Sequence, residues 1–219
     1  MNSAKGTFPC SLTPILVSGI TDAIAVSSGW AHSCALLKGG SVRCWGRDTA
    51  GELGSNATVT CADAVRSGSP PCSVTPVSVS GITNATAVAA GSQHTCILLA
   101  EGTIQCWGDN TSGALGNGTV TSSVTPVSVS GITNATAVAA SSHNCAVLGD
   151  GTLQCWGDPT NRPSPVSGIT NCIAVAPSGA YTCALLSAGS VQCWGSNTYG
   201  SLGDGTTTSS STPVTVVGF

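Results

Sequence analysis

Short apolar runs, broken by Gly, Ser or Thr, recur along the chain, and pairs of them flank a three-residue linker that ends in glycine. The runs "HTCILL" and "TIQCWG" are joined by "AEG" between His94 and Gly108. Runs of this length predict β-strands, and such a linker predicts a hairpin that ends in a positive-φ glycine. The same pattern begins at His32, His143 and Tyr181. Helical periodicity is absent, so the sequence predicts an all-β protein.

The hairpins belong to a longer internal repeat. The segment from Val74 to Thr119 recurs almost unchanged from Val124, where "VTPVSVSGITNATAVAA" is identical over 17 residues. The first cysteines of the hairpins, at positions 34, 96, 145 and 183, are 62, 49 and 38 residues apart. The first interval carries an insertion around "CADAVRSGSPPC", and the last lacks the "GALGNGT" segment. The middle interval therefore represents the length of one unit.

Each unit is predicted to contain four short strands. The first is "ATAVAAG", whose small residues suit a crowded position, followed by the two hairpin strands and an edge-like outer strand, "TPVSVSG", with proline at its start. Units of about 50 residues with four strands are typical of β-propeller blades. We therefore expect one propeller-type domain over residues 1–219. Its predicted parts are blades at residues 23–79, 85–129, 135–166 and 172–217, a surplus outer strand at residues 8–19 and an insertion at residues 55–73.

The regular cysteine spacing predicts a disulfide in every hairpin. If the linker is centred on Glu101, Cys96 and Cys106 lie opposite each other. Cross-strand partners have Cβ atoms roughly 4.5–5.5 Å apart, near the roughly 3.5–4.5 Å of a disulfide. A zinc site is the weaker interpretation, because one hairpin supplies only two ligands, and we predict no metal or cofactor. The same spacing pairs Cys34 with Cys44, Cys145 with Cys155, and Cys183 with Cys193.

Four cysteines lie outside the hairpins. Cys61 and Cys72 flank the insertion, and we expect a disulfide between them. "FPCSLTP" aligns with "PPCSVTP", so Cys10 corresponds to Cys72 and is left with Cys172. A Cys10–Cys172 bond would either close the ring within one chain or link two chains.

The pattern "G-x-x-H-T-C-x-L-x-x-x-G-x-[LIV]-x-C-W-G-x-N-x-x-G-x-L-G" resembles the regulator of chromosome condensation repeat family, in its Cys-paired version from secreted bacterial proteins. The resemblance implies propeller blades, seven of which usually form a ring, whereas this chain has four complete units. The name-giving member of that family is a nucleotide-exchange factor on chromatin. Other relatives are binding propellers, including a bacterial protein inhibitor of β-lactamases.

Several repeated residues are candidates for function, but repetition favours structural roles. His32, His94 and His143 precede the first hairpin cysteine by two residues, and we expect each to bond to a neighbouring blade. The tryptophan that follows the second cysteine is expected to pack between blades. These tryptophans are Trp45, Trp107, Trp156 and Trp194. Trp30 has no counterpart in the other units and is our candidate contact residue.

Composition and charge narrow the function. Only 7% of the residues are charged, and the six basic ones give a net charge of −3, which argues against nucleic-acid binding. No apolar run is long enough to span a membrane. The sequence contains no nucleophile elbow "GxSxG" and no arrangement typical of a Ser/His/Asp triad, so we do not expect an enzyme. The disulfides predict an extracellular or cell-surface location.

The surplus strand suggests two functions. A structural protein could assemble head to tail into a ring or filament through this strand, which would add to the edge of another subunit. The strand residues are Thr13, Pro14, Ile15, Leu16 and Val17. Alternatively, a monomeric binding propeller of inhibitor or adhesin type could hold an extracellular protein or glycan near Trp30 and the insertion.

Overall fold

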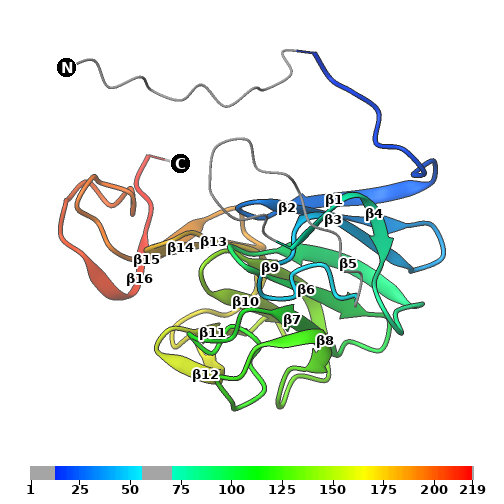
Figure 1. Cartoon of the computed structure of the whole chain (residues 1–219). Helices are drawn as coiled ribbons and strands as arrows, with labels where there is room; N and C mark the ends of the chain where they lie inside the picture. Colours follow the sequence, from blue (N-terminus) through cyan, green and yellow to red (C-terminus); the bar gives the residue numbers. More distant parts are fainter. Residues whose placement is uncertain (1–12, 56–70, 219) are drawn as a thin grey trace.

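The computed structural model describes residues 13–55 and 71–218, and these residues form sixteen strands and no helix (Figure 1). The strands make four antiparallel sheets of four strands each. This confirms the prediction of an all-β, propeller-type fold with four four-stranded blades. Each sheet is built from strands that are consecutive in the sequence, so every blade is a local unit.

The strand bounds are as follows. Blade 1 comprises β1 (Ala23–Ser28), β2 (His32–Leu37), β3 (Val42–Arg47) and β4 (Cys72–Ser78). Blade 2 comprises β5 (Ala85–Ala90), β6 (His94–Leu99), β7 (Ile104–Gly108) and β8 (Ser123–Ser128). Blade 3 comprises β9 (Ala135–Ala140), β10 (Asn144–Leu148), β11 (Leu153–Gly157) and β12 (Thr160–Pro165). Blade 4 comprises β13 (Cys172–Pro177), β14 (Tyr181–Leu186), β15 (Val191–Gly195) and β16 (Ser210–Thr215).

The inner strand of each blade lies beside the inner strand of the next blade (Figure 1). The strands β1, β5, β9 and β13 contact one another in that order. Their sequences are rich in alanine, as in "ATAVAA" of β5. Small side chains allow these strands to approach closely where the blades converge.

The hydrophobic core is divided into three clusters, and each cluster joins two successive blades. In the second cluster, Leu98, Ile104 and Leu115 of blade 2 pack with Leu148 and Trp156 of blade 3. A single sheet buries its faces only against its neighbours, so blade-to-blade packing provides most of the hydrophobic stabilisation.

Glycine is required where the hairpin touches the next blade. Gly102 has a φ of 82° in the hairpin turn, and its carbonyl accepts a hydrogen bond from the backbone N–H of Ala135 in blade 3 at 2.9 Å. Gly108 has a φ of 106° beside a register shift in the β7–β8 pairing. A Cβ atom there would lie 2.6 Å from the Gln93 carbonyl oxygen. The conserved geometry of the Trp-Gly pair therefore depends on the missing side chain.

Residues 13–19, part of the predicted surplus N-terminal strand, belong to no sheet within the described part of this chain. Pairing of this segment with another subunit stays a prediction. Ile15 and Leu16 are 78% and 100% exposed. The segment resembles the outer strands in sequence, but a strand forms only beside a partner with free backbone groups. The remainder of the predicted strand, residues 8–12, lies outside the described residues, as does most of the predicted insertion at residues 55–73.

Candidate interaction surfaces

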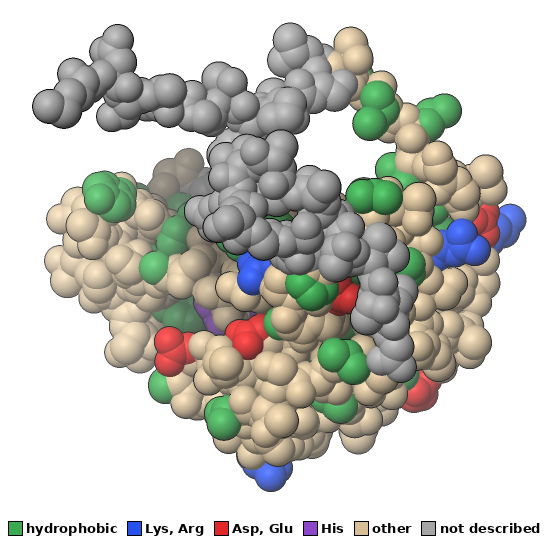
Figure 2. Space-filling view, in the orientation of Figure 1, with side chains coloured by type: hydrophobic (Ala, Val, Ile, Leu, Met, Phe, Trp, Pro, Cys, Tyr) green, Lys and Arg blue, Asp and Glu red, His purple; other side chains and the backbone are tan. Residues whose placement is uncertain are grey.

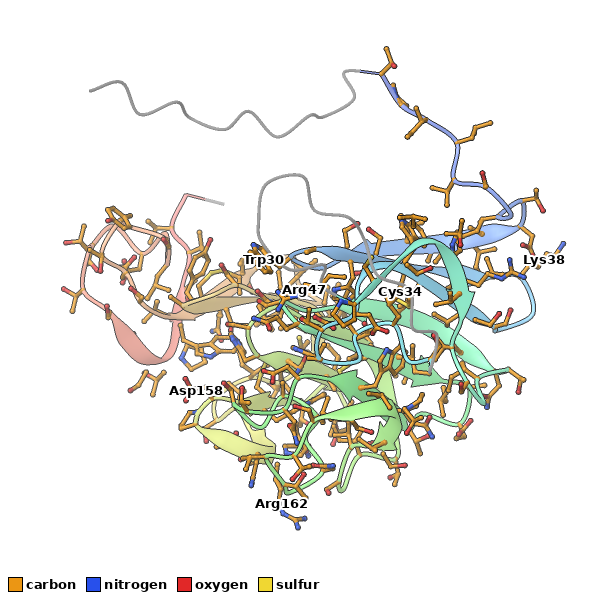
Figure 3. All side chains as sticks on the ribbon, in the orientation of Figure 1. Trp30, Cys34, Lys38, Arg47, Asp158 and Arg162 are labelled. Atoms are coloured by element: carbon orange, nitrogen blue, oxygen red, sulfur yellow. A yellow bond between two sulfur atoms is a disulfide. The ribbon has the colours of Figure 1, made fainter. Side chains whose placement is uncertain are left out.

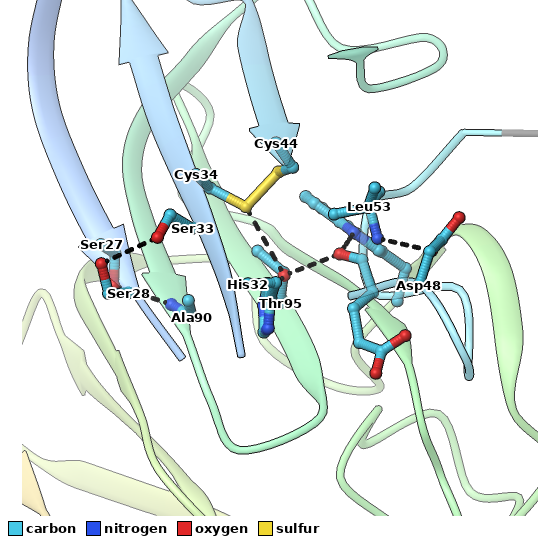
Figure 4. Close-up of a disulfide and its surroundings, with 12 residues drawn as sticks. Ser27, Ser28, His32, Ser33, Cys34, Cys44, Asp48, Leu53, Ala90 and Thr95 are labelled. Carbon is cyan, nitrogen blue, oxygen red and sulfur yellow. Dashed lines mark hydrogen bonds between the residues drawn. A yellow bond between two sulfur atoms is a disulfide. The ribbon is translucent and has the colours of Figure 1, made fainter. Parts of the chain in front are cut away.

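Each hairpin contains the disulfide that its cysteine spacing predicts. Cys34–Cys44, Cys96–Cys106, Cys145–Cys155 and Cys183–Cys193 have Cα atoms 4.1 Å apart in every case. The paired cysteines are direct partners in the strand register, as Cys96 and Cys106 illustrate. Figure 4 shows the Cys34–Cys44 bond between β2 and β3. The disulfides lie within blades and do not connect them.

The other cysteines have different outcomes. Cys72 is disulfide-bonded, but Cys61, its predicted partner, lies outside the described residues. Cys172 is a buried free thiol, so the predicted bond to Cys10 is not formed within this chain, and Cys10 is also outside the described residues. Cys172 stands where blades 2 and 3 have the buried Ala85 and Ala135. It fills a small apolar position, and burial raises the pKa of its thiol.

The three histidines bond to the following blade. His32 Nε2 lies 2.9 Å from Thr95 Oγ1, and His94 Nε2 lies 2.7 Å from Asn144 Oδ1. His143 Nε2 lies 2.7 Å from Thr182 Oγ1. Figure 4 shows His32 beside Thr95. The histidines therefore connect adjacent blades and do not converge on one site.

Burial keeps these histidines neutral. Desolvation, with smaller contributions from the nearby His94 and Arg47, lowers the pKa of His32 to about 4. Desolvation likewise lowers the pKa values of His94 and His143. The Thr95 hydroxyl donates to the Glu52 carbonyl oxygen at 3.1 Å, so it accepts a hydrogen bond from the N–H at Nε2 of His32. A neutral ring protonated at Nε2 satisfies this contact.

At two of the blade-to-blade junctions, a fully buried tryptophan donates a hydrogen bond to a turn of the preceding blade. The indole N–H of Trp107 donates to the Glu52 carbonyl oxygen at 2.8 Å, and that of Trp156 donates to the Ala114 carbonyl oxygen at 3.0 Å. Each acceptor precedes a fully buried leucine, Leu53 or Leu115. We call this element the leucine turn; it comprises residues 51–54 in blade 1, 113–116 in blade 2 and 200–203 in blade 4.

A polar side chain holds each leucine turn, and it is fully buried in blades 2 and 4. The Asn110 side-chain oxygen accepts a bond from the Leu115 N–H at 2.8 Å, while its amide group donates to the Thr119 and Thr121 carbonyl oxygens. Asn197 makes the equivalent bond to the Leu202 N–H at 2.9 Å. In blade 1, Asp48 replaces the asparagine, and burial raises the pKa of its carboxyl group.

Trp45 and Trp194 differ from the two sealed tryptophans. Both are half-buried, and neither indole N–H has an acceptor among residues 13–55 and 71–218. Trp45 belongs to the first blade, and the blade before Trp194 has no leucine turn. The prediction that repetition makes all four tryptophans equivalent core residues therefore overlooks this difference.

Trp30 is 72% exposed, as its position outside the repeat pattern predicts. The Arg47 guanidinium lies over its ring, 5.0 Å from the ring centroid, and both residues are labelled in Figure 3. The Arg47 Nε atom also lies 3.5 Å from Glu52 Oε1. Trp30 thus forms an exposed aromatic surface that a cation–π contact holds in place.

Most of the exposed large apolar side chains lie on or beside blades 1 and 4, with Val120 and Val124 exposed on blade 2. On the blade 1 side they are Ile15, Leu16, Val17, Ile24, Val26 and Trp30, and on blade 4 they are Ile173, Leu185, Tyr199 and Val217. Figure 2 shows hydrophobic side chains along the N-terminal segment that leaves the body of the molecule. Val26 is 73% exposed, whereas its counterparts Val88 and Val138 are half-buried against a neighbouring blade.

The part of the chain that the structure describes has no helix long and apolar enough to cross a membrane. Among the same residues, no group of three or more His, Cys, Asp or Glu side chains could hold a metal ion.

Four-stranded blades joined by repeated contacts define a propeller-type repeat protein. Two sequence profiles, both described as Regulator of chromosome condensation (RCC1) repeat, match the chain. One covers residues 23–52, 85–114 and 173–201, and the other covers residues 39–98, 101–148 and 188–219. The chain belongs to the RCC1-repeat family.

Named relatives match only in part. The mouse protein named "Probable E3 ubiquitin-protein ligase HERC4" is 31% identical over 114 residues, which are 51% of this chain and 10% of that protein. Protein pim1 of Schizosaccharomyces pombe is 31% identical over 86 residues, which are 38% of this chain and 16% of that protein. The chain therefore spans a small part of either relative.

Solved structures share the fold. Human WBSCR16 matches with a TM-score of 0.75 and 24% identity, over 89% of this chain and 52% of that one. Prp20p from Saccharomyces cerevisiae, whose structure was described with its binding properties to Gsp1p and histones, matches with a TM-score of 0.75 and 17% identity, over 94% of this chain and 53% of that one. At these identities the likeness concerns the fold alone.

Proposed function

We propose that this protein is a non-catalytic extracellular interaction module that associates head to tail with a second copy. In this arrangement the outer face of blade 4 in one copy packs against the outer face of blade 1 in the next. The observation that carries the proposal is that blade 4 exposes a side chain whose equivalents in blades 1, 2 and 3 are covered by the following blade. Leu185 is 36% exposed, whereas the equivalent Leu36, Leu98 and Val147 are at most 5% exposed.

The two end faces carry complementary halves of an internal junction. At the junction of blades 1 and 2, the first blade supplies a leucine turn and a histidine, and the second supplies Trp107 and Thr95. Blade 4 has its own leucine turn at residues 200–203 and Tyr181 at the histidine position. Blade 1 has Trp45 and Ser33 at the receiving positions. Head-to-tail contact would give the indole N–H of Trp45 an acceptor.

The N-terminal segment provides additional apolar contact in this proposal. Ile15, Leu16 and Val17 are exposed beside blade 1 and form no strand. Blade 1 of this copy would contact blade 4 of a neighbouring copy. We propose that the segment extends along the outer edge of that blade 4 and becomes ordered as a strand there. Each copy would use one such segment and accept another, so the contact is heterologous and builds a ring or filament.

The disulfides support an extracellular location. Four disulfides within the hairpins are typical of proteins that fold in an oxidising compartment. Yeast RCC1 (Prp20), which shares the fold, has been crystallised bound to Kap60. Protein binding is the property that we carry over, and the partner we propose is a second copy of this chain.

The test is sedimentation velocity on the oxidised protein across a concentration series. Val26→Asp and Leu185→Asp each place a charge on one end face, so each variant alone should remain monomeric. An equimolar mixture should give a dimer, because each variant retains the face that the other needs. Val120→Asp, at a position that is 59% exposed in blade 2, is the matched control and should associate like the wild type.

A wild-type protein that stays monomeric throughout would contradict the proposal, and so would a mixture that does not dimerise. A monomer would favour the alternative function, a binding propeller that uses the exposed Trp30 and its Arg47 neighbour. Trp30→Ala would then abolish partner binding, whereas Val26→Asp and Leu185→Asp would not.

A further inference from the structure

Blade 3 lacks the leucine turn that the other blades possess. In blades 2 and 4, residues 109–122 and 196–209 connect the third strand to the fourth. In blade 3, only Asp158 and Pro159 separate β11 from β12, and Gly157 pairs directly with Thr160. The third junction, between blades 3 and 4, therefore forms without the element that seals the first two.

A cavity lies where the missing turn would be. Its volume is about 310 Å³, and it lies between β11 and β14, with both Trp156 and Trp194 in its lining. Its lining also includes His143, Thr182, and the turn of Asp158 and Pro159. This volume is at the lower end of the range of ligand pockets in proteins.

The third hydrophobic cluster shows what is missing. The first cluster contains Leu53 with Trp107, and the second contains Leu115 with Trp156. The third has Trp194 at its margin and no leucine from such a turn. Trp107 and Trp156 are 0% and 1% exposed, whereas Trp194 is only half-buried.

Two hydrogen-bond donors are also left without their usual acceptor. At the first junction, the Glu52 carbonyl oxygen accepts bonds from the Trp107 indole N–H and the Thr95 hydroxyl. At the second, the Ala114 carbonyl oxygen accepts bonds from the Trp156 indole N–H and the Asn144 side-chain amide.

At the third junction, the corresponding donors are the Trp194 indole N–H and the Thr182 hydroxyl. No residue within 13–55 or 71–218 provides a carbonyl for both.

The two sealed junctions also specify the residue that must follow the leucine. Gly54 and Gly116 have φ values of 66° and 63°. A Cβ atom would lie 2.8 Å from Trp107 Nε1 in the first case and 2.7 Å from Trp156 Nε1 in the second. A side chain there would both strain the turn and push it away from the indole.

We propose that this cavity binds a leucine-bearing turn of a partner protein, with the local sequence Gly-x-Leu-Gly. The leucine side chain fills the cavity beside Trp194. The carbonyl of the residue before it accepts bonds from Trp194 and Thr182, and the following glycine permits the close approach to the indole. The site is distinct from the end faces used in head-to-tail association.

The probe is a cyclic, fluorescently labelled peptide that contains SGALGNG, the sequence of residues 112–118 of blade 2. Cyclisation reduces the ordering cost of binding. Fluorescence anisotropy measures affinity, and the indole N–H signals of the ¹⁵N-labelled protein locate the site. Trp194→Phe assigns the Trp194 signal and removes the donor.

We expect the Trp194 indole signal to shift in a saturable manner, while the signals of Trp107 and Trp156 stay unchanged. Replacing the peptide leucine by alanine should weaken binding by about tenfold or more, because much of the buried apolar surface is lost. Replacing the glycine after the leucine by alanine should weaken it comparably. The Trp45 signal reports separately on the blade 1 face.

A second variant supplies the turn in cis. Residues 109–122 of blade 2 replace Asp158 and Pro159, so the cavity is filled from within the chain and peptide binding should be lost. Trp194→Phe should weaken binding about fivefold through the lost hydrogen bond. This substitution keeps an aromatic side chain but removes the indole N–H, and the unchanged Trp107 and Trp156 signals would show that the protein is folded.

Three results would overturn the proposal. The first is a Trp194 indole signal that does not shift at the highest soluble concentration of the peptide. The second is equal affinity for the leucine and alanine peptides. The third is unchanged peptide binding by the grafted variant in its folded state. A Trp194 shift produced only by a disaccharide such as cellobiose, tested in parallel, would also overturn it in favour of a glycan site. None of these results depends on the oligomeric state of the protein.

Discussion

Two junctions of the molecule, between blades 2 and 3 and between blades 3 and 4, are built from equivalent strands, hairpins and disulfides. Only the junction between blades 2 and 3 has a leucine turn. The first buries Trp156 completely and satisfies its indole N–H, whereas the second leaves Trp194 half-buried beside a cavity. His143 still bonds to Thr182 across the incomplete junction. The strands are therefore sufficient to place successive blades, and the turn excludes water from the contact.

This difference separates two roles of the repeat. The hairpin, its disulfide and the inner strand build a blade, and the leucine turn makes one blade specific for the next. Within the described residues, blades 1 and 4 each leave half of this contact exposed, and blade 3 lacks the turn. Head-to-tail association and binding of a leucine-bearing turn would both complete such contacts.

The largest expected effect on stability comes from replacing Trp156, and the equivalent Trp194 is the comparison. Trp156→Ala should destabilise the protein by about 3–5 kcal/mol, because it empties a fully buried position and leaves the Ala114 carbonyl with one donor fewer. Trp194→Ala should cost clearly less, since that side chain is only half-buried. Urea unfolding of both variants measures the difference. Equal costs would show that the leucine turn does not seal its junction.

The pH dependence of stability should be dominated by the buried histidines. The folded pKa of His32, about 4, lies below its unfolded value of 6.5, so the unfolded state binds more protons between these values. Stability should be fully present above pH 6.5 and decline as the pH falls towards 4, by up to about 3 kcal/mol for His32.

His32→Gln keeps a polar side chain at this position and should flatten the decline. Unfolding experiments between pH 4 and 7 compare it with His143→Gln, at the incomplete junction, which should have the smaller effect because His143 is less deeply buried. A pH profile of His32→Gln that matches the wild type would refute the assignment.

Removal of a hairpin disulfide should cost about 2.5–3 kcal/mol from chain entropy alone, because each bond closes a loop with a sequence separation of 10 residues. The double variant of Cys145 and Cys155 to alanine tests a bond beside the complete junction. The matching double variant of Cys183 and Cys193 tests one at the end blade. Chain entropy predicts equal costs, and free energies of unfolding that differ by more than about 1 kcal/mol between the two double variants would show a packing contribution.

The smallest effect is expected for Cys172→Ala. Alanine occupies the equivalent positions 85 and 135, so the substitution should change stability by less than about 0.5 kcal/mol. Non-reducing electrophoresis of the same variant tests whether Cys172 links two chains. A covalent dimer that forms in the wild type and is absent from Cys172→Ala would support an intermolecular disulfide between Cys172 and Cys10.

The sequence predicts much of the blade because its signals are local. Gly102 and the cysteines on either side of it define a hairpin whose register follows from the linker length, and His94 at a strand start implies a polar partner nearby. The identity of that partner, Asn144, depends on how two blades pack, and no local pattern contains this information. The all-β propeller fold follows from the repeat, whereas the junction chemistry requires the structure.

Two predictions depend on partners that a local pattern does not contain. Residues 13–19 resemble "TPVSVSG", but a strand also needs an edge to pair with. The even number of cysteines leaves Cys172 with Cys10, whereas alignment of "NCIAV" with "NATAV" places Cys172 at a small buried position. The leucine turn was readable as "GELG", "GALG" and "GSLG", and its absence from blade 3 was the signal for the cavity.

The most direct measurement of head-to-tail association is a cross-linking experiment between two variants that each carry one engineered free cysteine. Ser33→Cys marks the face of blade 1, and Tyr181→Cys marks the face of blade 4, each in a Cys10→Ser, Cys172→Ala background. With a short bismaleimide, we predict a product with the mass of two chains when the variants are mixed, and none with either variant alone. Absence of the mixed product, or equal cross-linking of each variant with itself, would contradict head-to-tail contact.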